Sequence, residues 1–469
     1  MLMKSSLSRS WVICMLRDVV PPWLFTRALL LLITVLYAAP RSQWSHWPGV
    51  VLTTVLPDPR HPHNFLSPSP PVGDPIVNMW YRWDAAWYLR VAGNGPDMGY
   101  TQRFTENKDH NYGAFAFFPL YPLIVRTVAL AVPAANAPVP VGATPRPQLV
   151  VIGLVVANVT FVLTLIALYL LVKARAGPAT ARRTLWLLCI FPTTVVFSAP
   201  YSESLFLLWL VLFFLALDNR HWWLAGVCGA LASATRSNGA LLALPYVVAW
   251  GIDVFSRYDR GAIGGHGARG VQSTNSTSVD NGWFTNLLRG RSQAHWLLWL
   301  TTLAPVMLIP LGLFGYMAYQ WVSFGDPFLF QEAQKAWSRT LAPPWVGLID
   351  GFKWTLISWP HLTQPQWRGL TDALYALVFL LLTALAWRRT DWVGRTYALV
   401  FWVYVLCLPN ISDPKYPDTL ISTPRFLLVL VPLWIWLGHS RWRTALIAGP
   451  SALLLLAYTV RWVNGGWIG

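Results

Sequence analysis

The stretch from Trp80 to Tyr100 holds the densest group of residues in the chain that can do chemistry. On a helix, Trp80, Trp83 and Trp87 recur every three or four residues and form one stripe, with Asp84 at its edge. This pattern predicts an amphipathic helix lying on a membrane surface. A carboxylate at such a boundary can act as a general base. The residue pattern alone favours the alternative, in which Asp84 is an N-cap or a solvated residue on an interfacial anchor helix.

Two charged residues lie between apolar runs. Glu203 follows Pro200 in a short turn and either starts a helix, which the pattern favours, or faces an outer cavity. Arg236 has no acidic residue near it in the sequence. A guanidinium at a membrane edge is costly, so it either binds a lipid phosphate or closes a tight turn made by Asn238 and Gly239.

Two later segments add candidate binding groups. Phe330, Gln334 and Trp337 fall on one helical face, which suits sugar recognition by amide hydrogen bonds and ring stacking. A plain interfacial helix is the favoured alternative for that face. Lys415 and Arg425 bracket a segment with Pro and Asp, and we expect them to add positive charge to a site on the outer face.

Several kinds of functional motif are missing from the sequence. It has no Walker loop, no dinucleotide GxGxxG, no HExxH, no Ser–His–Asp signature and no metal-ligand spacing. We therefore expect no cofactor and no metal, and any group transfer needs an activated donor. The net charge is +16, but most basic residues flank apolar segments and form no nucleic-acid-binding array. We expect membrane lipids, and no nucleic acid, as partners.

The composition is that of an all-α polytopic membrane protein. Hydrophobic residues make up 55% and charged residues 12%, about half the charge fraction of a soluble protein. Soluble, disordered and fibrous proteins are thereby excluded. A membrane-spanning helix needs about 20 mostly apolar residues. The candidate segments are 22–40, 116–136, 148–172, 184–199, 201–217, 222–236, 237–251, 295–322, 370–387, 394–411, 424–438 and 443–463.

Lys and Arg in the loops predict the orientation. The N-terminus, 173–183, 252–293 and 388–395 are basic and are expected in the cytoplasm. The segment 323–369 is then expected outside.

In one part of the chain, the number of candidate spans conflicts with the orientation that the charges predict. If 116–136 and 148–172 both cross, the basic turn 173–183 falls outside. Either 116–136 is re-entrant or a short pair is miscounted. We expect one domain, 1–469, in which 41–115 is the first outer loop, 252–293 a flexible cytoplasmic loop and 323–369 a second large outer loop.

Several motifs, taken in order, resemble a known family. WDAAWYLRVA with the later Tyr100, FFPLYPL, FSAPYSESLF and ATRSNG together resemble the PIG-V type of mannosyltransferase and its bacterial relatives. GDPFLFQEAQKAWSR and TPRFLLVLVPL resemble later blocks of the bacterial relatives. The resemblance runs from about Trp80 to Pro432. Each motif alone is moderately specific, and five in order are a strong sign.

The resemblance implies a GT-C membrane glycosyltransferase with about 11–13 membrane helices and interfacial helices in a long first outer loop. It implies transfer of a sugar, mannose, from a polyprenyl-phosphate donor on the extracytoplasmic face of a bacterial plasma membrane. Asp84, at the family's Trp-Asp pair, would be the base of an inverting transfer. The acceptor would be a glycan, a glycolipid or a protein.

The resemblance and the charges together suggest a site. The leaving phosphate needs cations. Our candidates for these are Arg236, Lys415 and Arg425, with Lys108 and His110 as alternatives. The expected substrate-binding residues are Trp83, Tyr88, Tyr100, Glu203, Gln334 and Trp337. A transporter or flippase of a lipid-linked substrate is the alternative function, although internal repeats and charged pairs inside helices are sparse.

Overall fold

The structure of the protein is a computed structural model. It describes residues 9–42, 79–101, 113–135, 146–265, 301–334, 339–358, 364–410, 419–463 and 466–468. Within these ranges the chain is helical and contains no strand, apart from one isolated bridge between Arg339 and Asn410. The all-α prediction is confirmed. The expected loop 252–293 lies mostly outside the described residues, as does most of 41–115.

Five described helices are long and apolar enough to cross a membrane. A sixth span results if the bent pair 301–308 and Leu311–Phe324 (α12) counts as one. The five belong to α1 (Arg9–Ser42), α5 (Pro147–Ala176), η4 (Ser237–Leu242) with α9 (Ala243–Gly265), α15 (Gln364–Ala386) and α19 (Arg441–Val463).

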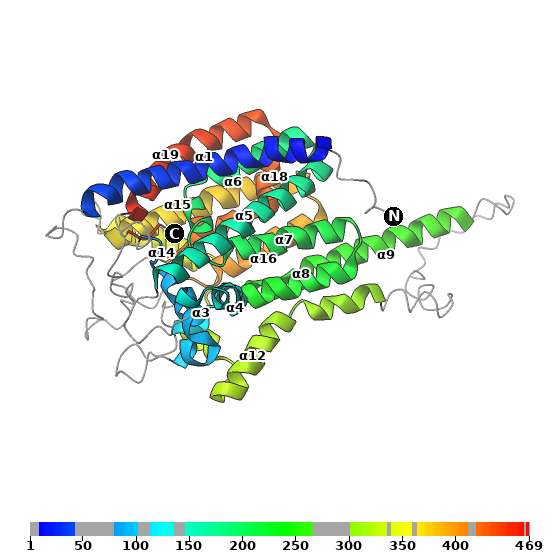
Figure 1. Cartoon of the computed structure of the whole chain (residues 1–469). Coiled ribbons are helices and arrows are strands. Elements are labelled where there is room, and N and C mark those ends of the chain that lie inside the picture. Colours follow the sequence, from blue (N-terminus) through cyan, green and yellow to red (C-terminus); the bar gives the residue numbers. More distant parts are fainter. Residues whose placement is uncertain are drawn as a thin grey trace.

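The other apolar helices are shorter, with nine to 16 residues, and the expected number of 11–13 membrane helices stays a prediction. They are α6 (Pro178–Ile190), α7 (Glu203–Asp218), α8 (Trp222–Thr235), α16 (Trp392–Leu406) and α18 (Val431–His439). Helix α7 is buried along most of its length and packs against α5 and α8. It forms the centre of the core (Figure 1).

The expected span 116–136 is a short helix, α4 (Leu120–Leu130), between the 3-10 turns η1 (Gly113–Ala116) and η2 (Pro133–Ala135). Its 11 residues extend about 17 Å, against about 30 Å of membrane hydrocarbon. This helix is therefore too short to cross. If α4 does not cross, α1 and α5 are consecutive long helices. The basic turn 173–183 then lies at the same end of the bundle as the start of α1.

That end of the bundle gathers the basic turns. Arg175 pairs with Asp218 at 2.6 Å, which joins the end of α5 to the end of α7. Arg182 of α6 lies 3.6 Å from Asp18 of α1. Helices α3 (Asp84–Thr101), α4 and α14 (Val346–Ser358) lie at the opposite end, beside the C-terminus (Figure 1).

The helix expected in the Trp80–Tyr100 stretch packs against protein on several of its faces, more than an amphipathic surface helix requires. Helix α3 begins only at Asp84, and residues on several of its faces, including Tyr88 and Leu89, are buried. Trp87 stacks on Phe117, with ring centroids 5.6 Å apart, and α3 packs against α4. The helix is thus inserted into the protein.

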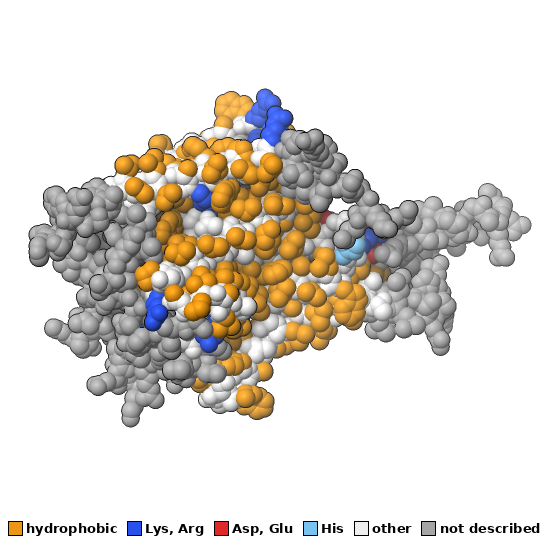
Figure 2. Space-filling view, in the orientation of Figure 1, with side chains coloured by type: hydrophobic (Ala, Val, Ile, Leu, Met, Phe, Trp, Pro, Cys, Tyr) orange, Lys and Arg blue, Asp and Glu red, His pale blue; other side chains and the backbone are white. Residues whose placement is uncertain are grey.

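The sides of the bundle are apolar. Figure 2 shows hydrophobic side chains over most of the described surface in that view. Long apolar side chains on the outer helices are exposed, among them Val155, Leu381 and Leu453. Exposed apolar surface of this extent marks contact with a membrane or a partner, and here it coincides with the long apolar helices. The protein is an integral membrane protein.

Candidate active site

Asp84 stands in the first turn of α3, where the positive end of the helix favours a carboxylate. The preceding residue, Trp83, has a left-handed backbone (φ 54), which is strained for a residue other than glycine. The ring of Trp83 lies edge-on to Trp467, with centroids 5.3 Å apart. Arg82 donates from Nη1 to the carbonyl of Trp462 at 2.6 Å. These contacts fix the start of α3 against the end of the chain.

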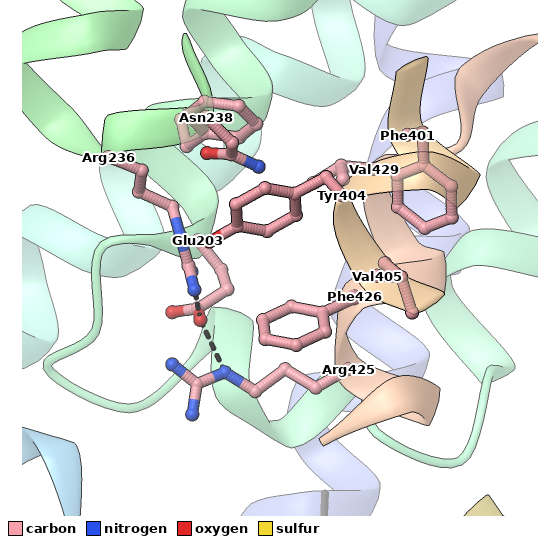
Figure 3. A pocket seen from close by; sticks show the side chains of 10 residues that line it. Glu203, Arg236, Asn238, Phe401, Tyr404, Val405, Arg425, Phe426 and Val429 are labelled. Atoms are coloured by element: carbon pink, nitrogen blue, oxygen red, sulfur yellow. Dashed lines mark hydrogen bonds and ion pairs between the residues drawn. The ribbon is translucent and has the colours of Figure 1, made fainter. Parts of the chain in front are cut away.

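Four charged side chains meet beside the start of α3, and we call them the acid–arginine network: Asp84, Glu203, Arg236 and Arg425. Nη2 of Arg425 pairs with Oδ2 of Asp84 at 2.5 Å, while its Nε donates to Oε1 of Glu203. Nη1 of Arg236 donates to the same Oε1 at 2.5 Å (Figure 3). Two carboxylates are thus joined by one shared arginine, and a second arginine closes the network.

Glu203 and Arg236 reach the network from neighbouring helices. Glu203 is the first residue of α7, and Arg236 is the C-cap of α8 in extended conformation. A tight turn follows Arg236, because a Cβ on Gly239 would lie 2.4 Å from the carbonyl carbon of Ala232. Arg236 therefore lies at a tight turn, as one of the two expectations had it, and binding of a lipid phosphate stays a prediction.

Arg425 is held by the short helix α17 (Thr423–Phe426). Ser422 before it is left-handed (φ 72), and its N–H donates to Oδ2 of Asp372 at 3.0 Å. Thr193 donates from Oγ1 to the carbonyl of Pro424 at 3.0 Å. The arginine is thus positioned by two buried polar contacts, one from Asp372 of α15 and one from Thr193 in the turn after α6.

Burial and charge act in opposite directions on the network. Glu203 is 2% exposed and Arg425 is 4% exposed. Burial alone disfavours a charged Glu203, but the neighbouring guanidiniums of Arg425 and Arg236 compensate that cost. Burial likewise disfavours a charged Arg425, and the carboxylates of Asp84 and Glu203 compensate it.

The network opens on a small pocket. Its polar lining consists of Glu203, Arg236, Asn238 and Arg425, and its largely apolar lining of Phe206, Phe401, Tyr404, Val405, Phe426 and Val429. In Figure 3, Glu203, Arg236 and Arg425 lie on one side and Phe401, Tyr404 and Phe426 on the other. A pocket with one charged and one largely apolar wall fits a ligand that has both a charged and an apolar part.

The structure places the remaining predicted residues in different surroundings. Tyr88 is buried one turn after Asp84, and its hydroxyl lies 2.6 Å from Oγ of Ser202. Gln334 ends α13 (Leu329–Gln334) and is half-buried. Tyr100 lies in α3, but its side chain is not described. Lys108, His110, Trp337 and Lys415 lie outside the described residues.

Sequence reasoning missed several residues of the site. Arg339, Tyr404 and Phe426 belong to its surroundings, and Asp372 supports α17. Arg339 is the last residue of the GDPFLFQEAQKAWSR block and Phe426 follows Arg425, so their neighbourhood offered a signal. Within the described ranges, no three His, Cys, Asp or Glu side chains are grouped so that they would hold a metal ion.

Comparisons with known structures give a weak likeness. The Archaeoglobus fulgidus oligosaccharyltransferase in the apo form has a TM-score of 0.41 at 13% identity, over 93% of this chain and 56% of that one. The same enzyme tethered with an acceptor peptide has a TM-score of 0.39 at 12% identity, over 99% and 56%.

Sequence comparisons are more specific. GPI mannosyltransferase 2 of Cryptococcus neoformans var. neoformans serotype D, from two strains, is 33% identical over 159 residues. This match covers 34% of this chain and 34% of the relative, so the chain aligns with about a third of the relative's length. The family profile described as Mannosyltransferase (PIG-V) matches residues 22–256, which include Asp84, Glu203 and Arg236. The chain belongs to the mannosyltransferase (PIG-V) family.

Proposed function

We propose that the chain is a GT-C membrane glycosyltransferase that moves mannose from a polyprenyl-phosphate donor to an acceptor hydroxyl. One observation carries this proposal: the carboxylate of Asp84 pairs with the buried Arg425, which also binds Glu203, beside a pocket lined by both charged and apolar side chains. A lipid-linked sugar has the matching parts, a charged phosphate and an apolar chain. Family membership supports the mannosyl group.

The chemistry uses the two oxygens of Asp84 differently. Oδ2 is paired with Arg425, so Oδ1 is the oxygen that takes the proton. The acceptor oxygen attacks the anomeric carbon, its proton passes to Oδ1, and a new glycosidic bond forms. The bond between the anomeric carbon and the phosphate oxygen breaks, and its electron pair leaves with polyprenyl phosphate. Attack from the face opposite the leaving group inverts the anomeric centre.

The proposed orientation places the site outside the cytoplasm. The basic turns lie at the other end of the bundle, and basic turns face the cytoplasm in most membrane proteins. We assign the protein to a bacterial plasma membrane, as a single domain with its site on the extracytoplasmic face. The acceptor is a glycan, a glycolipid or a protein, with Trp83, Tyr88, Tyr100, Glu203, Gln334 and Trp337 as candidate binding residues.

The deciding experiment measures transfer of labelled mannose from polyprenyl-phosphate mannose in membranes. Asp84→Asn should lower the rate by roughly 10²- to 10⁴-fold, because the base is lost and the shape is kept. Asp391→Asn is the matched control, since Asp391 caps α16 and Asn caps helices equally well. Equal rates in Asp84→Asn and wild type would contradict the assignment of the base. Movement of the lipid without transfer would favour a flippase.

A further inference from the structure

The backbone of Arg339 is fixed against the end of α16. Arg339 forms an antiparallel bridge with Asn410, and the next residue, Thr340, donates from N–H to the carbonyl of Pro409 at 3.1 Å. Ala342 donates in the same way to Cys407 at 3.0 Å. Arg339 therefore starts from a rigid position, although it lies outside any helix.

The side chain of Arg339 reaches the wall of the pocket. Its guanidinium carbon lies 5.3 Å from the ring centroid of Phe426, and that of Arg236 lies 5.7 Å from the same centroid. Both distances are within the range of a cation–π contact. Nη2 of Arg339 donates to the carbonyl of Ile421 at 3.3 Å. Phe426 lines the pocket, so two cations flank one ring of its wall.

The charges around this ring do not balance. Arg236 and Arg425 are paired with Glu203 and Asp84. Among the described residues, no Asp or Glu pairs with Arg339. Burial is the main cause that lowers the pKa of Arg339; the nearby charges of Arg236 and Arg425 lower it further, while Tyr404 and Asp84 act in the opposite direction. Three arginines and two carboxylates leave one positive charge at the pocket.

We propose that Arg339 binds the phosphate of the polyprenyl-phosphate donor and stabilises the negative charge that develops on it during transfer. This inference rests on the proposed function. When the bond between the anomeric carbon and the phosphate oxygen breaks, the electron pair adds a second negative charge to the phosphate. Arg339 has four N–H groups beyond the one that Ile421 accepts, so it can donate to two phosphate oxygens at once.

The two other arginines are less suited to this role. If Arg236 and Arg425 both turned to the phosphate, Glu203 would remain buried and unpaired, which is strongly unfavourable. If Arg425 alone moved, Asp84 would lose its partner. Arg339 has no such partner to give up, so it can bind an anion while the acid–arginine network stays intact.

The test compares two lipids that differ only in the phosphate. Full-length protein in detergent is assayed for binding of polyprenyl phosphate and of the matching polyprenol, by displacement of a labelled polyprenyl phosphate. Wild type should prefer the phosphate. Arg339→Gln should reduce that preference roughly ten- to a hundredfold, and Arg339→Lys should retain part of it. In transfer assays, Arg339→Gln should raise the KM for the donor and also lower kcat.

Arg395→Gln is the matched control. The guanidinium of Arg395 also lies over an aromatic ring, 4.6 Å from the centroid of Trp392, and its Nε donates to the carbonyl of Trp387 at 2.9 Å. It stands near the basic turns, at the end of the bundle away from the network. Its replacement should leave the preference for phosphate unchanged.

Several results would overturn the assignment. One is a wild type that binds polyprenyl phosphate no better than polyprenol, and another is an Arg339→Gln variant that keeps the full preference. A third is an Arg339→Gln variant that binds both lipids more weakly by the same factor, which indicates only a structural role. Displacement by phosphatidylglycerol as strong as by polyprenyl phosphate would assign the arginine to ordinary membrane lipids. The binding assay needs no turnover, so it decides the role of Arg339 even if mannose transfer fails.

Discussion

Asp84 at the start of α3 and Arg425 in α17 form an ion pair of 2.5 Å, and Arg425 also binds Glu203 at the start of α7. One guanidinium thus holds two carboxylates that come from different helices. The fork of nitrogens in arginine permits this, because Nη2 and Nε each serve one acid. The position of Asp84 is therefore coupled to the core through Arg425.

Arg425→Lys should lower the transfer rate more than tenfold although the charge is kept. A single ammonium group cannot reproduce the fork that serves Asp84 and Glu203 together. The rate is measured with labelled donor at matched expression. Arg395→Lys is the control, and it should retain the wild-type rate. Full activity in Arg425→Lys would show that the shared pairing is not needed.

Glu203→Gln should destabilise the protein by about 3–5 kcal/mol, because Arg236 and Arg425 lose their shared carboxylate in a buried place. Thermal unfolding of purified protein measures the loss. Glu332→Gln is the control, since Glu332 is exposed on α13. An unchanged unfolding temperature in Glu203→Gln would mean that the network contributes nothing net to stability.

Gly239→Ala should destabilise the protein by about 1–3 kcal/mol and lower the transfer rate, because a methyl group would collide with the backbone of α8. The turn that positions Arg236 would have to open. Gly251→Ala in α9 is the control, since a Cβ there meets nothing within 4 Å. It should be neutral or slightly stabilising. Equal stability of the two variants would show that the turn can relax.

Part of the site was predictable from the sequence. Asp84, Glu203, Arg236 and Arg425 each stood out as charges next to apolar runs. The sequence did not predict that these four side chains pair with one another, because a charge between two helices does not indicate which distant segment supplies its partner. Arg339 was missed because its role depends on the bridge to Asn410, a contact far apart in sequence.

Part of the fold was predictable as well. The long apolar segments became long helices, because hydropathy reports length and burial in a membrane. Hydropathy does not show where a helix is interrupted within an apolar segment. Pro119 caps α4 and Pro122 stands in its first turn, so they start a short helix inside the expected span 116–136. In α3, the stripe of rings predicted one apolar face, while Ala85 and Ala92 allowed burial of the others.

The site draws on segments that lie far apart in the sequence, and this has a consequence for biogenesis. A ribosome delivers Asp84 and Glu203 to the membrane long before Arg425 and Trp467, which packs on Trp83. Arg236 is synthesised before Arg425, so it can pair with Glu203 first. Asp84 has no arginine from the network until Arg425 is made. The acid–arginine network is thus completed late in synthesis. A chain that ends before α17 lacks the arginine that pairs with Asp84.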